Sequence, residues 1–187
     1  MIPLPPPAEV RPALPAWWRQ FSNLPNLESE FVQTSESAVF GTLRKQGRLA
    51  VARGGRLRVA YDKGLLLVSD GKRLIQYDPQ THTAQGLDLA RAIGEFPLLN
   101  VLMDPRNLEK SYEVIGEGAK LRLKPRHAGL PEVLVEGQGS FPTRIIWKDG
   151  TGAQQNLSLI HPTPASFLGA AKFKFDPPKG TRWLGKQ

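Results

Sequence analysis

The sequence has no cysteine, which excludes disulfides, thiolate metal sites and cysteine nucleophiles. It also has no run of about eighteen apolar residues, so no transmembrane helix is predicted. Aromatic residues make up only 8% of the chain, but the hydrophobic fraction of 40% is ordinary. A chain of 187 residues with this composition is long enough for one domain with a substantial core.

Residues with catalytic or metal-binding chemistry are few and scattered. The three histidines lie far apart in loop-like sequence, and none has the spacing of a metal ligand. The Gly-Gln-Gly-Ser sequence at residues 137–140 has the wrong order for a nucleophile elbow, and no Walker loop or Rossmann fingerprint occurs. Four aspartates fall in predicted turns, where backbone hydrogen bonding explains them: Asp62, Asp70, Asp78 and Asp149. The sequence therefore predicts no enzyme, no metal site and no cofactor.

Basic residues outnumber acidic residues, and the formal net charge is +8. Such a charge raises the question of nucleic-acid binding. However, the basic residues of segments such as 120–124 and 172–174 alternate along predicted strands and form no cluster with interleaved aromatics. We therefore predict a solvated strand face and no nucleic-acid partner. Attraction to anionic lipid headgroups is a weaker alternative.

Six prolines occur within residues 1–15. Proline fixes its backbone angle and donates no hydrogen bond, so we predict a flexible, extended arm there and a single domain over residues 16–187. The opening Met1-Ile2-Pro3 lacks the basic start and apolar stretch of a secretory signal. If the protein is exported, its signal peptide is absent from this sequence.

Residues 48–79 contain the clearest secondary-structure pattern. Leu49 and Val51, and then Leu57 and Val59, alternate with polar or small residues, which is typical of strands with one apolar face. Turn signals separate the strands: Gly54-Gly55, Asp62-Lys63-Gly64 and Asp70-Gly71. The segment is predicted to be an antiparallel β-meander.

Arg53 is unusual within this meander because it is in phase with Leu49 and Val51. A buried and unpaired guanidinium is costly. The pattern leaves two interpretations open: Arg53 ends its strand and turns outward, or it points inward and has partners.

The rest of the chain is also rich in short strands. A helix is predicted over residues 15–24, and two short apolar helical segments are predicted within residues 87–103. The segment 39–51 is expected to contain a bulge at Gly41 or Gly47. Further strands are predicted at residues 27–34, 81–86, 111–115, 120–124, 131–136, 143–148, 153–160 and 171–175. Short strands with regular turn signals favour a barrel or a strongly curved antiparallel sheet.

The helical segment at residues 87–103 is too apolar to lie in water, so it must cover an apolar surface. Two interpretations remain open from the pattern. The helices either complete an ordinary core, or they form a lid over an apolar ligand cavity.

Two motifs resemble the LolA family of periplasmic lipoprotein carriers. Residues 66–79, LLVSDGKRLIQYDP, are similar to the family's V-S-D-G-K turn and the following strand that ends in Y-[DN]-P. Residues 171–180, AKFKFDPPKG, are similar to the family's last strand. The two motifs lie near opposite ends of the chain and in the family's order.

This resemblance implies a mainly β protein, an unclosed antiparallel β-barrel (half-barrel) with a helical lid over a hydrophobic cavity. It also implies a soluble, monomeric carrier in the periplasm. Such a carrier takes lipoprotein acyl chains from an inner-membrane ABC transporter complex and passes them to an outer-membrane receptor.

The resemblance also assigns residues. Arg53, at the end of Gly47-Arg48-Leu49-Ala50-Val51-Ala52-Arg53, matches the family's arginine that hydrogen-bonds the lid, so it is the expected lid-gating residue. The expected cavity and lid residues are Leu49, Val51, Leu57, Val59, Leu89, Ile93, Phe96, Leu98 and Leu99.

The chain departs from the family pattern at three places. Arg53 is followed by Gly54 instead of proline, and Leu57 and Val59 replace two aromatics. An alternative is therefore a LolA-like binding module for another lipid, such as a fatty acid, a phospholipid or a lipidated intermediate.

Overall fold

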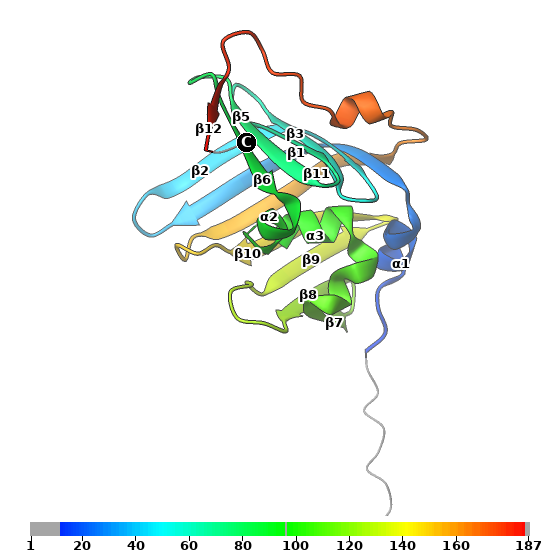
Figure 1. The fold of residues 1–187 in the computed structure, drawn as a ribbon. Helices are drawn as coiled ribbons and strands as arrows, with labels where there is room; N and C mark the ends of the chain where they lie inside the picture. Colours follow the sequence, from blue (N-terminus) through cyan, green and yellow to red (C-terminus); the bar gives the residue numbers. More distant parts are fainter. Residues whose placement is uncertain (1–11, 96, 186–187) are drawn as a thin grey trace, which may run out of the picture.

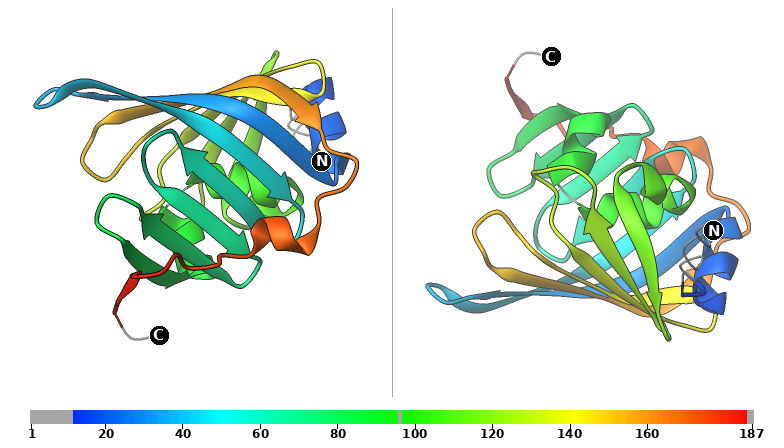
Figure 2. Two further views of the ribbon diagram at one scale, coloured as in Figure 1. Left: turned by 90° about the horizontal axis from the view of Figure 1, so that it is seen from above. Right: turned by 90° about the horizontal axis from the view of Figure 1, so that it is seen from below.

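The structure is a computed structural model that describes residues 12–95 and 97–185, without the side chains of residues 93–98 (Figure 1). Most of the chain forms one twelve-stranded sheet with the order β12-β6-β5-β4-β3-β2-β1-β11-β10-β9-β8-β7. All neighbours are antiparallel except β12 and β6. The two outermost strands of the described sheet do not pair with each other, so the sheet curves without closing into a barrel (Figure 2). The predicted mainly β, unclosed fold is confirmed.

Most strands follow one another with short connections, but α2, α3 and η1 lie between β6 and β7, and residues 165–181 lie between β11 and β12. Their bounds are β1 Asn26–Ser37, β2 Gly41–Ala52, β3 Arg56–Tyr61, β4 Leu66–Asp70, β5 Arg73–Asp78, β6 Thr83–Asp88, β7 Tyr112–Glu117, β8 Lys120–Pro125, β9 Val133–Gln138, β10 Phe141–Lys148, β11 Gln154–Pro164 and β12 Arg182–Leu184. The helical elements are α1 Ala16–Asn23, α2 Leu89–Glu95, α3 Pro97–Met103 and the 3₁₀ turns η1 Pro105–Lys110 and η2 Ala170–Phe173.

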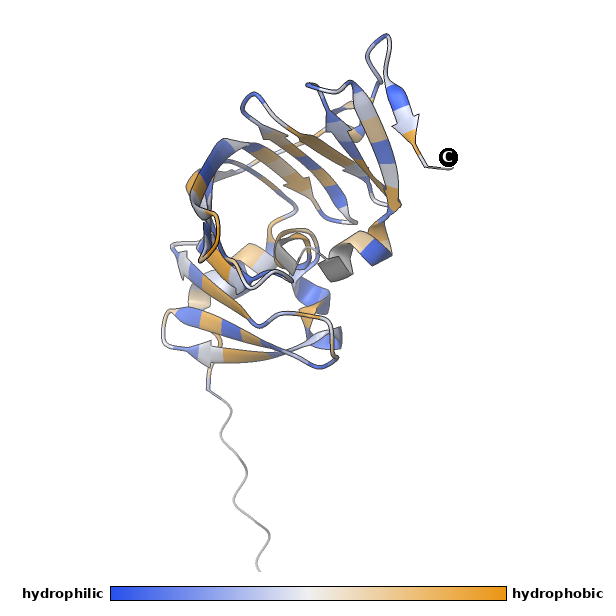
Figure 3. Cartoon of the chain, turned by 90° about the vertical axis from the view of Figure 1, so that its left-hand side faces the viewer, coloured by the Kyte–Doolittle hydropathy of each residue, from blue (hydrophilic) through white to orange (hydrophobic). Residues whose placement is uncertain are grey.

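The concave face of the sheet carries the main apolar core. Alternating residues of the strands point inward and are buried together with α1 and with the helices α2 and α3, which we call the helical lid. Figures 1 and 2 show the lid inside the curve of the sheet, and Figure 3 shows apolar positions alternating along the strands. Period-two alternation in the sequence therefore produced one apolar and one wet face, as predicted.

Helix α1 packs against the strands β9 and β10. Trp17, Trp18 and Phe21 are all buried, and the Trp17 indole Nε1 donates to the carbonyl of Ala119 at 2.8 Å. A Cβ at Gly137 would lie 2.1 Å from the Trp17 ring, so only glycine allows this helix to sit so close to β9. The predicted helix is confirmed, and it packs on the sheet.

The segment that follows β11 crosses the convex face of the sheet. Leu168 and Phe173 pack on Ala50 and Ala52 of β2, on the side opposite the main core. The predicted strand at 171–175 is wrong, because this segment forms the turn η2 and then runs without a ladder partner. Phe173 is buried against Leu168, Ala50 and Ala52 on the convex face. Of the residues after β11, only 182–184 join the described sheet, as β12.

The predicted bulge in β2 is also wrong. β2 pairs with β1 and with β3 without any shift of register. A Cβ at Gly47 would lie 2.0 Å from the carbonyl oxygen of Ala60, so glycine is required there by the close approach of β3. Register shifts lie instead between β1 and β11, next to Ser29, and between β10 and β9, next to Thr143.

The proline-rich arm predicted from the sequence falls mostly on residues that the structure does not describe. Residues 12–15 lead into α1, and the carbonyl oxygen of Ala13 approaches Gly116 of β7. The division into an arm over 1–15 and a domain over 16–187 stays a prediction.

Candidate functional site

A cavity of about 190 Å³ lies between the concave face of the sheet and the helical lid. Its lining comes from β1, β2, β3, β4, β10, β11, α3 and the turn between β10 and β11, and most of it is apolar. The lining residues are Phe31, Gln33, Leu49, Val59, Tyr61, Leu67, Leu99, Trp147, Asp149, Gln155 and Leu157. Such a surface suits an apolar ligand with few polar contacts.

Three of the residues expected from the sequence line this cavity: Leu49, Val59 and Leu99. Three others, Val51, Leu57 and Leu89, are buried in the same apolar cluster without being among the lining residues. The structure does not describe the side chains of the remaining three expected residues, Ile93, Phe96 and Leu98.

The other lining residues were not expected from the sequence. Phe31 of β1 and Trp147 of β10 belong to strands that were predicted, but sequence alone does not show which strands meet across a cavity. The only available signal was their inward phase, which Phe31 shares with Leu27 and Trp147 shares with Ile145.

One end of the cavity is polar. The Tyr61 hydroxyl donates to the Gln33 side-chain oxygen at 2.7 Å, and the Gln33 amide donates to Gln155 at 3.1 Å. The Gln155 amide then donates to Asp149 and to Ser35, each at 2.8 Å. Burial raises the pKa of Tyr61, so its hydroxyl stays a donor at neutral pH. These bonds satisfy the polar groups at the end of the cavity.

Arg53 points inward, which decides between the two interpretations of its phase. Its guanidinium donates to the carbonyl of Leu102 in α3 at 2.7 Å and to the carbonyl of Phe21 in α1 at 2.6 Å. It also lies over the Phe21 ring, 4.9 Å from the centroid. One side chain at the end of β2 thus ties together the last turns of two helices.

The charge of Arg53 is costly to bury. Desolvation, together with the nearby positive charge of Arg106, lowers the pKa of Arg53 to about 10, and Asp104 acts in the opposite direction. At neutral pH the guanidinium is still charged. Its Nε has no hydrogen-bond partner among the described atoms. The two backbone carbonyls therefore provide most of the hydrogen bonding that offsets the cost of burying the charge.

Arg106 extends this arrangement and was missed in the sequence. Its Nε donates to the carbonyl of Ser22 at 2.9 Å, and a terminal nitrogen donates to Asn23 Oδ1 at 3.0 Å. Two arginines therefore bind the C-terminal end of α1, from the end of β2 and from η1. No local pattern signals this contact, because Arg106 lies 84 residues from Ser22.

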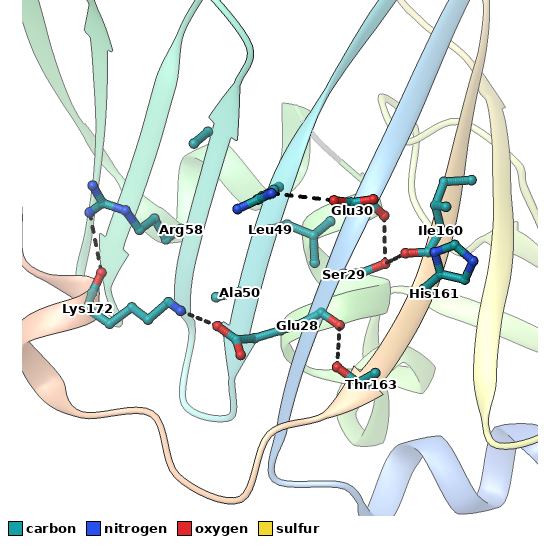
Figure 4. Close-up of a pocket in the computed structure, with 12 residues that line it drawn as sticks. Glu28, Ser29, Glu30, Leu49, Ala50, Arg58, Ile160, His161, Thr163 and Lys172 are labelled. Carbon is teal, nitrogen blue, oxygen red and sulfur yellow. Dashed lines mark hydrogen bonds and ion pairs between the residues drawn. The ribbon is translucent and has the colours of Figure 1, made fainter.

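A second depression of about 610 Å³ lies on the convex face, between β11, β1, β2, β3 and η2 (Figure 4). Most of its charged residues pair with one another: Glu28 with Lys172, and Glu30 with Arg48 at 3.6 Å, while Arg58 donates to the carbonyl of Lys172 at 3.4 Å. The Ser29 hydroxyl donates to the carbonyl of Ile160 at 3.0 Å. Because these groups already satisfy one another, we assign no ligand to this groove.

Other chemistries find little support in the described part of the chain. It contains no group of three or more histidine or acidic side chains placed to hold a metal ion. None of its helices is both long enough and apolar enough to cross a membrane. The fold and the cavity together define a lidded β protein, with an apolar cavity between a helical lid and an open, curved sheet.

Comparison with known proteins identifies the family. The model of the family described as outer membrane lipoprotein carrier protein LolA matches residues 22–176. The outer-membrane lipoprotein carrier protein of Bordetella avium is 31% identical over 145 residues, which cover 73% of this chain and 69% of the relative. That of Alkalilimnicola ehrlichii is 26% identical over 168 residues, covering 87% of this chain and 78% of the relative. The chain belongs to the LolA family.

Solved structures agree on the fold. A LolA superfamily protein from Nitrosomonas europaea has a TM-score of 0.54 at 12% identity and covers 87% of this chain and 99% of its own. An uncharacterized conserved protein from Thermus thermophilus has a TM-score of 0.52 at 15% identity and covers 89% of this chain and 92% of its own. At these identities the likeness concerns the fold alone.

Proposed function

We propose that this protein is a periplasmic carrier that binds the acyl chains of lipoproteins in its cavity and shuttles them toward the outer membrane. The observation that carries the proposal is Arg53, which holds α3 and α1 in place beside an apolar cavity. The family's carrier role supports the choice of ligand. The carrier domain is residues 16–187, and it acts by binding and not by catalysis.

The size of the cavity implies that the lid moves. A volume of 190 Å³ lies below the range of about 300–1,000 Å³ that is usual for ligand pockets. One acyl chain has about fifteen methylene groups. We therefore propose that a lipoprotein enters when α2 and α3 move away from the sheet and enlarge the cavity.

Energetics explain why such a carrier needs a gate. Burying a methylene gains roughly 0.8 kcal/mol, so one chain of about fifteen is worth on the order of 10 kcal/mol. A carrier cannot release a ligand bound so strongly into water. It must pass the chain to a comparable apolar site. Closing the lid through Arg53 reduces the free-energy difference between the chain bound to the carrier and the chain bound to that site.

The proposed partners follow from the family role. An inner-membrane ABC transporter complex supplies the lipoprotein, and an outer-membrane receptor accepts it. We propose that the carrier acts as a soluble monomer in the periplasm.

The decisive experiment is release of a newly made, radiolabelled lipoprotein from spheroplasts. We expect the purified protein to bring the lipoprotein into the supernatant as a soluble one-to-one complex. Absence of release, while an active carrier works in the same preparation, would contradict lipoprotein carriage. Native mass spectrometry of the purified protein would then show whether it retains a fatty acid, a phospholipid or a lipidated intermediate instead.

A further inference from the structure

The hairpin formed by β1 and β2 projects beyond the rest of the sheet (Figures 1 and 2). Both strands have twelve residues, but β3 pairs with β2 only from Gly47 to Ala52. Residues 41–46 of β2 are all exposed. The end of the hairpin is therefore unsupported on the β2 side.

The tip of this hairpin is apolar. Val39 is 81% exposed, Phe40 is 90% exposed and Leu43 is 56% exposed. These are three of the five large hydrophobic side chains found exposed in the described part, the others being Phe167 and Leu184. Single exposed apolar residues are ordinary, but a group of three at a projecting end indicates an interaction site.

The tip has a defined conformation. The Ser37 hydroxyl oxygen accepts hydrogen bonds from the backbone N–H groups of Val39 and Phe40, at 3.2 and 3.3 Å. Gly41 has a φ of +71° and closes the turn. The turn thus presents Val39 and Phe40 outward with their backbone partly satisfied.

Basic residues lie behind the apolar tip. Arg44 and Lys45 follow Phe40 by four and five residues, or roughly 13 to 17 Å along the strand at about 3.3 Å per residue. A side chain at the headgroup–acyl boundary lies about 5–10 Å deep. With Phe40 at this depth, Arg44 and Lys45 would lie at the level of the phosphates or just outside them.

We propose that the β1–β2 tip docks the protein on an anionic phospholipid bilayer by inserting Val39 and Phe40 at the headgroup–acyl boundary. The charge supports this partner, since Arg44 and Lys45 outnumber Glu36, the one acidic residue of segment 35–46, and the whole chain carries +8. A convex apolar tip also suits a deformable lipid surface.

Docking through this tip would place the cavity at the membrane. Leu43 pairs with Ser35 and Lys45 pairs with Gln33, so both lie on the cavity side of the hairpin. The Lys45 Nζ lies 5.9 Å from the centre of the Tyr61 ring, and Tyr61 and Gln33 line the polar end of the cavity. The inserted hairpin would therefore lead from the bilayer to the cavity along one face.

The absence of cysteine allows a direct test. Ala38→Cys is labelled with an environment-sensitive fluorophore and mixed with phosphatidylcholine vesicles, with and without phosphatidylglycerol. Ala128→Cys, at an exposed site in the β8–β9 loop, is the matched control. We expect a blue shift at position 38 that grows with phosphatidylglycerol and no shift at position 128.

Variants separate insertion from general adsorption. Val39→Ser with Phe40→Ser is expected to weaken vesicle binding by roughly tenfold or more, whereas Phe167→Ser, which removes a ring that is 81% exposed elsewhere, leaves it unchanged. The proposal is overturned if position 38 shows no shift, or if the tip variant binds as well as the unchanged protein. Self-association through the tip, seen as tip-dependent dimers without vesicles, would also overturn it. The vesicles contain no lipoprotein, so this proposal and the carrier function can fail separately.

Discussion

Arg53 shows how one side chain can couple a sheet to two helices. Its charge is partly desolvated, and its two shortest contacts are backbone carbonyls at the ends of α1 and α3. Hydrogen bonds to a charged group contribute about 1.5–3 kcal/mol each, and breaking them leaves a buried charge uncompensated. Opening the lid therefore costs the free energy of these hydrogen bonds, and binding of the ligand must offset that loss.

We predict that Arg53→Leu loads lipoprotein but transfers it onward roughly tenfold less, which corresponds to about 1.4 kcal/mol. The reason is that the closed, empty state loses its hydrogen bonds while the loaded state does not, so the ligand is held more tightly. The measurement is transfer of a radiolabelled lipoprotein to outer-membrane vesicles. Arg106→Leu is the control, because Arg106 contacts α1 without binding α3. Unchanged loading and transfer in Arg53→Leu would contradict a role of Arg53 in gating the lid.

Asp149 gives a prediction for pH. Hydrogen bonds from Thr151, partly offset by desolvation, and a further bond from Gln155 lower the pKa of Asp149 below its ordinary value of 3.8. A carboxyl with a lowered pKa in the folded state contributes stability that is complete above pH 3.8. That contribution is lost as the pH falls through the lowered value.

Asp149→Asn is therefore expected to lower the stability by about 1 kcal/mol at pH 7 and by less at pH 3, where part of the contribution is already lost. Urea unfolding at the two pH values measures the difference. An equal loss at both pH values would show that the charge of Asp149 is irrelevant to the turn.

At the scale of elements, the close approach of β2 and β3 depends on Gly47. We predict that Gly47→Ala destabilises the protein by about 1–3 kcal/mol, because the new methyl group overlaps the backbone of Ala60. Gly150→Ala is the matched control, since a Cβ there meets nothing within 4 Å, and its effect should stay within about 0.5 kcal/mol. Thermal unfolding of the two variants tests the prediction, and equal melting temperatures would contradict it.

At the scale of the whole molecule, a cavity of only 190 Å³ beneath the lid and a long apolar ligand require two states. We predict that a long-chain lipopeptide makes the backbone amides of α3 exchange with deuterium faster, while those of β4 and β5 keep their rates. The reason is that filling the cavity displaces the lid but leaves the sheet intact. Hydrogen exchange followed by mass spectrometry measures this. Slower exchange in α3 on loading would indicate that the ligand fits beneath an unmoved lid.

The sequence by itself determined the elements of this fold. Alternation in the meander, the Asp-Gly and Gly-Gly turns and the apolar segment over 87–103 specify strands, turns and helices locally, because period-two and helical patterns depend on neighbouring residues. The inward phase of Arg53 was also visible. The strand expected at 171–175 failed because its two phenylalanines alternate as in a strand, yet Phe173 is held by Ala50 and Ala52.

Tertiary structure alone decided what the elements do together. The partners of Arg53 lie 32 and 49 residues away, so no local pattern could name the carbonyls of Phe21 and Leu102. The choice between a solid core and a cavity depended on how closely the lid packs on the sheet, which is a property of the packed state. The projecting tip at Val39 and Phe40 also became visible only when β3 proved too short to cover the outer half of β2.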